Sequence, residues 1–315
     1  MRIALALLVA LAAPLAGQEA EMAADVAYLA ADRMGGRAAT EEGNADAARY
    51  VAERFARLGL APVFEEPRCR GRAACARGWF QEFAIAPDLL ARTGLARGTG
   101  RNVAARVEGT DPALRGEVVV VGAHFDHVGR GSFGSRGMEG AVHNGADDNA
   151  SGTAAVLELA RRLAARPARR TVLLVAFDAE ELGLLGSEHF VEDPPVPIGS
   201  VVGMVNLDMV GRLRDDRLTL YGVESAPGLR AVAADAAKGT GLEIRPLART
   251  SGRSDDAPFA RRRIPAIHLF TGRHADYHAA GDDAERINTA GLARVTDYAE
   301  RVLRAIADRD ERLRR

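Results

Sequence analysis

Histidine and carboxylate side chains follow four apolar runs of this sequence, and their types suit the binding of divalent metal ions. They are His124 and Asp126, Glu180 and Glu181, Asp208, and His278, while Asp148 opens a helix-like segment after the first run. Imidazoles and carboxylates gathered in one place stay costly to desolvate unless a cation holds them. Mixed nitrogen and oxygen ligands favour zinc or a similar divalent ion. Five ligands, three of them carboxylates, exceed the needs of one tetrahedral zinc and suit two ions that share a bridging carboxylate and water.

These residues need a scaffold that brings the ends of separate strands together. Runs rich in Val, Ile and Leu predict buried strands over residues 118–121, 171–177, 201–207 and 264–270. Helical spacing predicts helices within 25–60, which turns at 35–36 and 43–44 interrupt, and over 153–163, 226–238 and 290–309. Residues 61–100 are expected to be irregular, apart from a short strand at 80–83. Strands separated by helices indicate an α/β fold with a largely parallel sheet, in which ligands bind at the carboxyl ends of the strands.

The 315-residue chain has balanced charge and ordinary globular composition. Its 42 basic and 43 acidic residues give a formal net charge of −1, which argues against a bulk electrostatic partner such as nucleic acid. Hydrophobic residues make up 47% of the chain, which argues against global disorder. The sequence contains no internal repeat and no low-complexity linker, so we expect one domain.

The first residues have the pattern of a secretory signal peptide. Met1 and Arg2 precede an apolar run over 3–13, and small residues follow up to Gly17. The run is too short for a comfortable transmembrane helix, and no later stretch reaches the roughly 18 apolar residues that a span needs. We therefore expect a signal peptide at 1–17, a single domain at 18–315, export to the periplasm or the medium, and no stable membrane insertion.

The two cysteines, Cys69 and Cys75, lie in a loop-like stretch rich in arginine. An even count and an exported context favour a disulfide that closes this small loop, and two free thiols are the alternative. Two cysteines alone make a poor metal site.

The order of motifs along the chain closely resembles peptidase family M28, which comprises co-catalytic zinc aminopeptidases and carboxypeptidases. The motifs are His124-Phe125-Asp126-His127, Gly145-Ala146-Asp147-Asp148-Asn149-Ala150-Ser151-Gly152, Glu180-Glu181-Leu182-Gly183, Asn206-Leu207-Asp208-Met209 and Asp276-Tyr277-His278. The stretch over 145–152 is very specific. The resemblance covers about residues 25–305, and it implies a three-layer α/β fold whose mostly parallel central sheet is flanked by helices.

Carried over residue by residue, the resemblance implies a site for two zinc ions. Asp148 bridges both ions in the family pattern. His124 and Asp208 complete the first metal site, and Glu181 and His278 complete the second. The peptide bond between Asp148 and the next residue is expected to be cis.

The resemblance also implies roles for residues beside the ligands. Glu180 is the general base that activates a metal-bridging water and later gives the proton to the leaving amine. Asp126 orients His124, a role that metal-binding histidines usually require, and Tyr277 donates to the tetrahedral oxyanion. The remaining polar residues of these loops are expected to be structural or to lie beside the ligands; they are His127, His143, His274 and Asp147.

Two positions depart from the family pattern without replacing a ligand. Ser254-Asp255-Asp256 stands where the family often has Ser-Asp-His, and Ala280 stands where it often has proline. Both departures concern pocket shape and specificity. A glutaminyl cyclase, which acts at one zinc, is the nearest alternative, and a non-enzymatic binding protein is another. The complete ligand set and the presence of Glu180 favour the peptidase.

The charge around the metals bears on which end of a peptide is cut. A free α-ammonium is best held by carboxylates, and Glu180 and Asp208 have oxygens to spare. A carboxypeptidase would need a positioned cation, for which Arg253 and Arg273 are candidates. We therefore expect an exported two-zinc exopeptidase that hydrolyses N-terminal peptide bonds, with a carboxypeptidase of the same family as the alternative. Its expected partners are peptide substrates, and its oligomeric state stays open.

Overall fold

A nine-stranded sheet forms the centre of the protein in the computed structural model, which describes residues 17–65, 76–95, 98–131, 133–137 and 140–313. The order across the sheet is β1-β5-β7-β6-β8-β11-β9-β10, and β4 also pairs with β5. The strands are β1 (Ala61–Pro62), β4 (Phe80–Ala84), β5 (Thr99–Val107), β6 (Val118–His124), β7 (Thr171–Phe177), β8 (Val201–Leu207), β9 (Arg217–Tyr221), β10 (Glu243–Pro246) and β11 (Ala266–Phe270). A separate antiparallel pair is formed by β2 (Phe64–Glu65) and β3 (Arg77–Gly78).

The four strands in the middle of the sheet are parallel. β6 pairs with β7 and β8, and β8 pairs with β11. Every residue of β6, β7 and β8 is buried, which is typical of Val- and Leu-rich strands covered on both faces. The carboxyl ends of all four strands therefore reach the same edge of the sheet.

Several strands toward the edges of the sheet run antiparallel to their neighbours, whereas the sequence predicted a mostly parallel sheet. β5 runs antiparallel to β7, and β1 and β4 run antiparallel to β5. On the opposite side β9 is antiparallel to β11. β4 and β9 alternate buried and more exposed residues, so they lack the continuous apolar runs that identify the central strands. The short strand at 80–83 is confirmed, whereas the region before residue 100 is more regular than expected.

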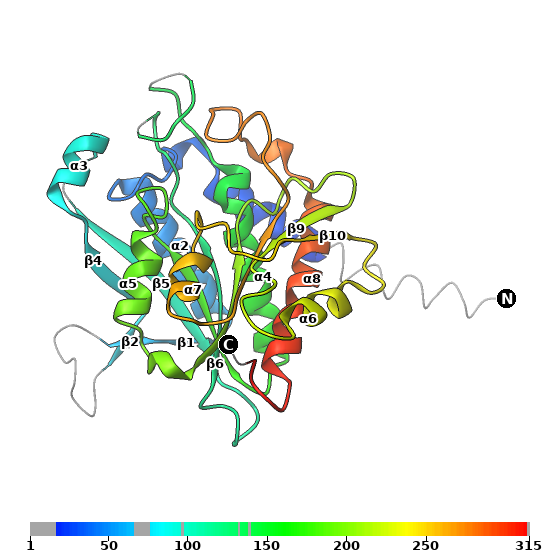
Figure 1. Cartoon of the computed structure of the whole chain (residues 1–315). Helices are drawn as coiled ribbons and strands as arrows, with labels where there is room; N and C mark the ends of the chain where they lie inside the picture. Colours follow the sequence, from blue (N-terminus) through cyan, green and yellow to red (C-terminus); the bar gives the residue numbers. More distant parts are fainter. Residues whose placement is uncertain (1–16, 66–75, 96–97, 132, 138–139, 314–315) are drawn as a thin grey trace.

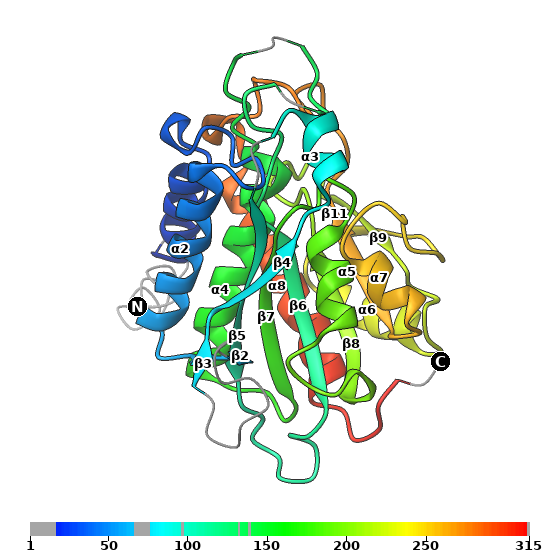
Figure 2. The same cartoon turned by 90° about the vertical axis from the view of Figure 1, so that its left-hand side faces the viewer.

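Helices cover both faces of the sheet and make three layers (Figures 1 and 2). One face carries the helix over 17–29, α2 (Glu42–Arg57), α4 (Gly152–Ala165), α6 (Leu229–Ala237) and α8 (Thr289–Ala307). The other face carries α5 (Leu185–Glu192) and α7 (Asp256–Arg261), and α3 (Pro87–Thr93) lies beyond the end of β4. Short helical turns complete the chain: η1 (Asp32–Met34), η2 (Ala146–Ser151), η3 (Ile198–Ser200) and η4 (Ala284–Arg286). The predicted α/β fold with helices on both sides is confirmed.

Apolar side chains join the layers on each face. Beneath α5 and α7, the rings of Phe177, Phe190 and Phe259 pack with centroids 5.7 to 6.1 Å apart, a separation typical of favourable aromatic contacts. The opposite face holds a larger cluster that includes Phe55 of α2 and Val302 of α8, both fully buried. Packing on both faces holds the central strands in place, and it therefore positions the loops that follow their carboxyl ends.

The first helix begins earlier than the sequence pattern suggested. It covers residues 17–29 rather than starting at 25, because Met22, Val26 and Leu29 already form a buried stripe at helical spacing. The segment expected to be the signal peptide, apart from Gly17, lies outside the described residues, and so does the Cys69–Cys75 pair. Within the described residues, no helix has the length and apolar character that crossing a bilayer requires.

Candidate metal centre and active site

The expected site residues meet at the carboxyl edge of the four parallel strands. His124 ends β6, Glu180 and Glu181 follow β7, and Asp208 follows β8 directly. Three further residues come from loops beyond the strands: Asp148 from η2, and Tyr277 and His278 from the loop after β11. The seven residues named in this paragraph line one cavity at this edge of the sheet, whereas Asp126, the remaining expected site residue, does not.

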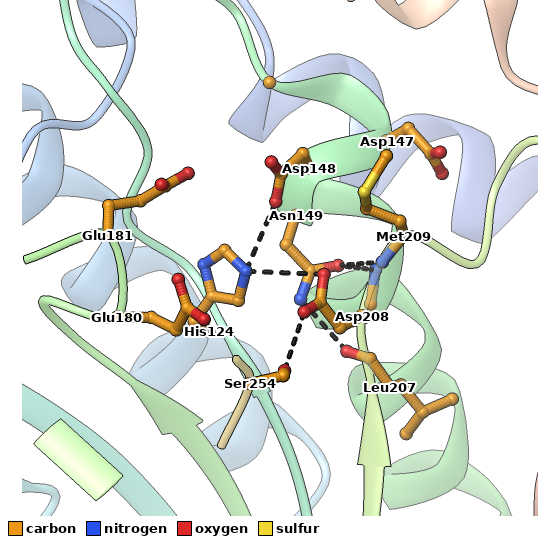
Figure 3. Close-up of polar contacts among 12 residues, drawn as sticks. His124, Asp147, Asp148, Asn149, Glu180, Glu181, Leu207, Asp208, Met209 and Ser254 are labelled. Carbon is orange, nitrogen blue, oxygen red and sulfur yellow. Dashed lines mark hydrogen bonds and ion pairs between the residues drawn. The ribbon is translucent and has the colours of Figure 1, made fainter. Parts of the chain in front are cut away.

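Asp148 lies between two imidazoles and offers one oxygen to each. Its Oδ1 is 3.3 Å from His124 Nε2, and its Oδ2 is 3.0 Å from His278 Nε2. Asp208 Oδ1 lies 3.6 Å from His124 Nε2, and Glu181 Oε2 lies 3.2 Å from His278 Nε2. The five expected ligands therefore form two groups that share Asp148, and Figure 3 shows the contacts around His124.

The outer nitrogens of both imidazoles face backbone carbonyls. His124 Nδ1 is 3.2 Å from the carbonyl oxygen of Asp126, and His278 Nδ1 is 2.8 Å from that of Gly134. Because a carbonyl oxygen only accepts, Nδ1 carries a hydrogen in each ring, and whenever the ring is neutral its Nε2 lone pair faces the carboxylates. A lone pair opposite anionic oxygens repels them unless a proton or a metal ion lies between. This donor arrangement is the one that metal-binding histidines usually show.

The spacing of the donors fits zinc. Two ligands that each lie roughly 2.0–2.1 Å from a tetrahedral zinc are about 3.3 Å apart. The contacts of the two imidazoles with Asp148, Asp208 and Glu181 span 3.0 to 3.6 Å. The side chains present therefore fit the binding of a divalent metal ion.

The titration of these groups shows how strongly the site attracts positive charge. Burial lowers the pKa of His278, but its contacts with Asp148 and Glu181 outweigh burial and raise the pKa to about 11. Burial and the charge of Asp148 raise the pKa of Glu181, but its hydrogen bonds with His127 and His278 outweigh them and lower the pKa to about 2. A cation at this position, whether a proton or a metal ion, is therefore strongly favoured.

The glycines that bound the motif over 145–152 allow η2 to approach β8. Gly145 has a φ of +57°, and a Cβ on Gly152 would lie 2.3 Å from the carbonyl oxygen of Leu207. Asn149 then donates from Nδ2 to that carbonyl at 3.0 Å and accepts at Oδ1 from the backbone N–H of Met209 at 3.2 Å. These bonds tie η2 to the strand end that carries Asp208. The bond between Asp148 and Asn149 is cis, as the resemblance implied.

The adjacent aspartates of this motif point in opposite directions (Figure 3). Asp147 turns away from the two imidazoles and accepts from the backbone N–H of Gly211 at 2.6 Å, while its other oxygen lies 3.1 Å from His274 Nε2. Asp282 accepts from the backbone N–H groups of both aspartates, at 2.9 and 3.0 Å. Asp147 and His274 therefore brace the loop, as expected, and leave Asp148 alone facing the imidazoles.

Asp126 contacts both the imidazole and the turn after β7. Its Oδ1 lies 3.6 Å from His124 Nδ1. The same carboxylate accepts from the backbone N–H of Glu180 at 3.0 Å and from that of Glu181 at 3.2 Å. Asp126 therefore holds the turn that carries the two glutamates, which was not anticipated from the sequence, while its carboxylate lies beyond hydrogen-bond distance of the His124 ring.

Glu180 lies beside His124 and Asp208, and donor atoms of the three residues fall within 4.8 Å of one another. Burial raises the pKa of Glu180 well above its usual range, and the charges of Glu181 and Asp208 raise it further against the opposing effect of His124. Figure 3 shows the carboxyl group of Glu180 beside the His124 ring and that of Glu181 farther from it. A glutamate with a high pKa beside the expected ligands is suited to accept a proton.

His127 contacts the site through a glutamate. Its Nδ1 is 3.0 Å from Glu181 Oε1, whereas its distance to Asp148 Oδ2 is 4.0 Å. His127 can thus orient the carboxylate of Glu181. Its ring also belongs to a group with Asp148, Glu181 and His278 whose donor atoms lie within 4.8 Å of one another, so the geometry equally admits it as a ligand. The other expected loop histidine, His143, bonds through Nδ1 to the carbonyl oxygen of Ala141 at 3.0 Å.

Tyr277 lies at the cavity wall next to the imidazole of His278. The two rings stack with centroids 3.9 Å apart. Burial raises the pKa of Tyr277, and the nearby carboxylates of Asp148 and Glu181 raise it further. The phenol therefore keeps its proton at neutral pH and remains a hydrogen-bond donor.

A buried polar network behind Asp208 was missed by sequence reasoning. Ser254 donates from Oγ to Asp208 Oδ2 at 2.6 Å and accepts from Asn206 Nδ2 at 2.6 Å. Below them, His268 Nδ1 is 3.6 Å from Asp256 Oδ1, and both side chains are buried. The unusual Ser254-Asp255-Asp256 triplet was the available signal, but its contact with His268 depends on the pairing of distant elements.

The comparison with protein families gives one match: a model described as peptidase family M28 matches residues 102–303. Among characterised relatives, leupeptin-inactivating enzyme 1 from Streptomyces exfoliatus is 31% identical over 191 residues, which are 60% of this chain and 39% of the relative. Aminopeptidase YwaD from Bacillus subtilis is 31% identical over 194 residues, which are 58% of this chain and 39% of the relative. The matched part thus spans about two fifths of these relatives.

Solved structures share the fold over nearly the whole chain. A zinc aminopeptidase from Bacillus subtilis has a TM-score of 0.70 at 17% identity, and the match covers 93% of this chain and 96% of that chain. A Zn-dependent exopeptidase from Parabacteroides distasonis has a TM-score of 0.68 at 20% identity, with 92% and 98% covered. At such identities the similarity establishes the three-layer fold.

Proposed function

The chain belongs to peptidase family M28, and we propose that it is an exported two-zinc aminopeptidase that removes residues from the N-terminus of peptides. The observation that carries this proposal is the position of Asp148, which offers one carboxylate oxygen to each of two imidazoles at 3.3 and 3.0 Å. A carboxylate shared between two such groups suits a pair of adjacent metal ions. The relatives named above supply the aminopeptidase activity as an analogy.

In this proposal the two metal sites share one bridging ligand. Asp148 serves both, His124 and Asp208 complete one site, and Glu181 and His278 complete the other. When bound, the zinc ions would polarise the scissile carbonyl and make water more acidic. The bonds from His124 Nδ1 and His278 Nδ1 to backbone carbonyls support this assignment, because they leave both Nε2 atoms free to bind metal.

Glu180 acts as the general base in the proposed reaction. Its carboxylate accepts a proton from the attacking water and returns it to the leaving amine. Burial and the carboxylates of Glu181 and Asp208 raise its pKa well above the usual range, which favours holding the proton between these steps. Tyr277 donates from its phenol to the carbonyl oxygen as negative charge develops there.

The acidity of the site supports cleavage from the N-terminus. Glu180 and Asp208 both line the cavity, so carboxylate oxygens face the position where a peptide α-ammonium would lie. A carboxylate beside the metals compensates the desolvation of an ammonium group. Arg253 and Arg273 line the same cavity and could hold a terminal carboxylate, so peptides blocked at one end or the other decide between the two polarities.

The proposal extends to the organisation of the chain. Residues 1–17 form a signal peptide, residues 18–315 form one catalytic domain, and Cys69 pairs with Cys75 after export. The sequence pattern of the first residues supports the first statement. The continuous sheet, whose order runs from β1 at one edge to β10 at the other, supports the second.

The direct test of polarity uses a matched pair of short peptides. One carries an N-acetyl group and a free C-terminus, and the other carries a free N-terminus and a C-terminal amide. With zinc-loaded protein, we expect cleavage of the amidated peptide and none of the acetylated one. The reverse pattern would establish a carboxypeptidase and overturn the proposed polarity.

A further inference from the structure

The cavity that contains the candidate metal centre extends well beyond it. Its volume is about 590 Å³, which is enough for a substrate side chain as well as the reacting bond. One wall is made by the rings of Tyr221, His268 and Phe270, with centroids 5.4 to 6.2 Å apart. Arg253 and Arg273 also line the cavity and bring two positive charges to it.

Neither arginine forms an ion pair with an acidic residue in the part of the chain that the structure describes. Within the described residues, no carboxylate oxygen lies within 4.0 Å of either guanidinium group. The acid nearest to Arg273 along the chain, Asp276, pairs with Arg212 at 3.3 Å and with Arg286 at 3.2 Å instead. The acids that follow Ser254 next to Arg253 are buried and turned inward.

Arg273 is also held close to the reacting centre. Its Cζ lies 4.8 Å from the centroid of the Tyr277 ring, a cation–π distance. Tyr277 in turn stacks on His278. Arg273 is exposed overall, but this contact places its guanidinium one ring away from the candidate metal ligands.

The charges in the cavity leave a positive excess once metals are bound. Four carboxylates line the cavity: Asp148, Glu180, Glu181 and Asp208. Two divalent ions would balance them, and the two guanidinium groups would then remain without a counter-charge. An anionic group of the substrate is the natural partner for cations in such a site, because a guanidinium donates well to a carboxylate.

We propose that the preferred substrates carry a carboxylate beside the scissile bond, and that Arg253 and Arg273 recognise it. The aliphatic stem of the acidic residue packs on the wall formed by Tyr221, His268 and Phe270 while its carboxylate reaches the guanidinium groups. This proposal rests on the proposed peptidase function and adds the substrate class to it. The carboxylate can belong to the first residue, to the second residue, or to the C-terminus of a dipeptide.

Matched substrate pairs that differ only in this charge test the proposal with zinc-loaded protein. The pairs are Glu- and Gln-p-nitroanilide, Leu-Glu-amide and Leu-Gln-amide, and Leu-Leu and Leu-Leu-amide; they separate the three sources of the carboxylate. We expect the acidic member of at least one pair to have the higher kcat/KM. Competitive inhibition by free glutamate against free glutamine gives a second readout, which measures binding without turnover.

The variants Arg253→Gln and Arg273→Gln test the residues. Each is expected to lower the acid-to-neutral ratio of kcat/KM by about tenfold, which corresponds to about 1.4 kcal/mol for one charge-assisted hydrogen bond. Arg245→Gln is the matched control, because Arg245 is an exposed arginine of β10 outside the cavity. Higher ionic strength is expected to lower the acid-to-neutral ratio of kcat/KM in the unmutated protein. It is not expected to lower this ratio in the double variant that combines Arg253→Gln and Arg273→Gln.

The outcomes separate this proposal from the function on which it rests. Cleavage of Leu-p-nitroanilide with no acidic preference in any pair would overturn the acidic substrate class and leave the aminopeptidase standing. An acidic preference that survives in both arginine variants would also overturn it. Failure to cleave any free N-terminal substrate would instead refute the proposed function itself.

Discussion

The replacements Glu180→Gln and Glu181→Gln should both lower activity, the first by slowing catalysis with zinc retained and the second by weakening zinc binding. Glu180→Gln replaces one carboxyl oxygen by an amide nitrogen and keeps the shape of the side chain. The turn keeps its anchor, because the backbone N–H groups of both glutamates donate to Asp126 at 3.0 and 3.2 Å. A glutamine cannot accept the proton that Glu180 takes, so kcat is expected to fall by about 10² to 10⁴, or about 2.7 to 5.5 kcal/mol in barrier height.

Glu181→Gln should act first on zinc affinity. Glu181 contacts His278 Nε2 at 3.2 Å and His127 Nδ1 at 3.0 Å, and its replacement removes a negative charge from one of the two metal sites. Loss of a supporting hydrogen bond alone typically costs 10–100-fold in metal affinity, so loss of a ligand charge should cost at least about tenfold. Excess zinc is therefore expected to restore part of the activity of Glu181→Gln and none of that of Glu180→Gln.

The assay measures zinc content by elemental analysis and kcat with a peptide amide, each at a series of free zinc concentrations. Asp111→Asn, which changes a carboxylate paired with Arg169 away from the site, serves as the control for handling and folding. If Glu180→Gln lost one equivalent of zinc while Glu181→Gln kept both, the assignments of base and ligand would have to be exchanged. Full activity of Glu180→Gln would remove the general-base role altogether.

Three further predictions concern protons, stability and export. The pKa of His278 near 11 in the absence of metal means that zinc must displace a proton from this ring. Zinc affinity should therefore rise with pH, and zinc binding should release protons. Calorimetry in buffers of different ionisation enthalpy measures this release, and its absence would contradict the assignment of His278 as a ligand. Burial raises the pKa of Asp256 from 3.8 to about 8, so this group contributes stability below pH 4 that is lost as pH rises through 8. Between pH 4 and pH 8, the free energy of unfolding of Asp256→Asn should therefore rise relative to that of the unmutated protein. Urea unfolding at several pH values measures both free energies, and a difference that does not change with pH would refute this. The intact mass of secreted protein should lack residues 1–17 and rise by two hydrogens on reduction of Cys69–Cys75; a mass that retains Met1, or two free thiols, would contradict the respective claim.

The sequence predicted the parts of the fold that have a strong periodic signal. The runs that became β6, β7 and β8 are continuously apolar because helices cover both their faces. Each run leads to a residue that chemistry singles out: His124 ends β6, Asp208 follows β8, and Glu180 lies shortly after β7. The weaker edge strands alternate in burial, and β1 has only two residues. Their pairing depends on neighbours that are distant in the sequence, so single-sequence patterns identified β4 but not β1, β9 or β10.

The direction of each side chain could not be read from the sequence. Asp147 and Asp148 are adjacent, and only the geometry of η2 turns one toward His274 and the other toward the two imidazoles. The contact of Asp256 with His268 joins the start of α7 to β11, which becomes visible only in the folded chain. The resemblance to the family supplied the roles of the matched motifs, but it gave no partner for residues that depart from the family pattern.

Zinc titration of the chelated protein tests the central claim most directly. Protein freed of metal is titrated with zinc while bound zinc and hydrolysis of a free N-terminal peptide amide are followed together. The arrangement of two imidazoles and three carboxylates around Asp148 predicts that bound zinc approaches two equivalents per chain and that activity appears with it. Full activity at a single equivalent, or two equivalents without peptide hydrolysis, would contradict the two-zinc aminopeptidase.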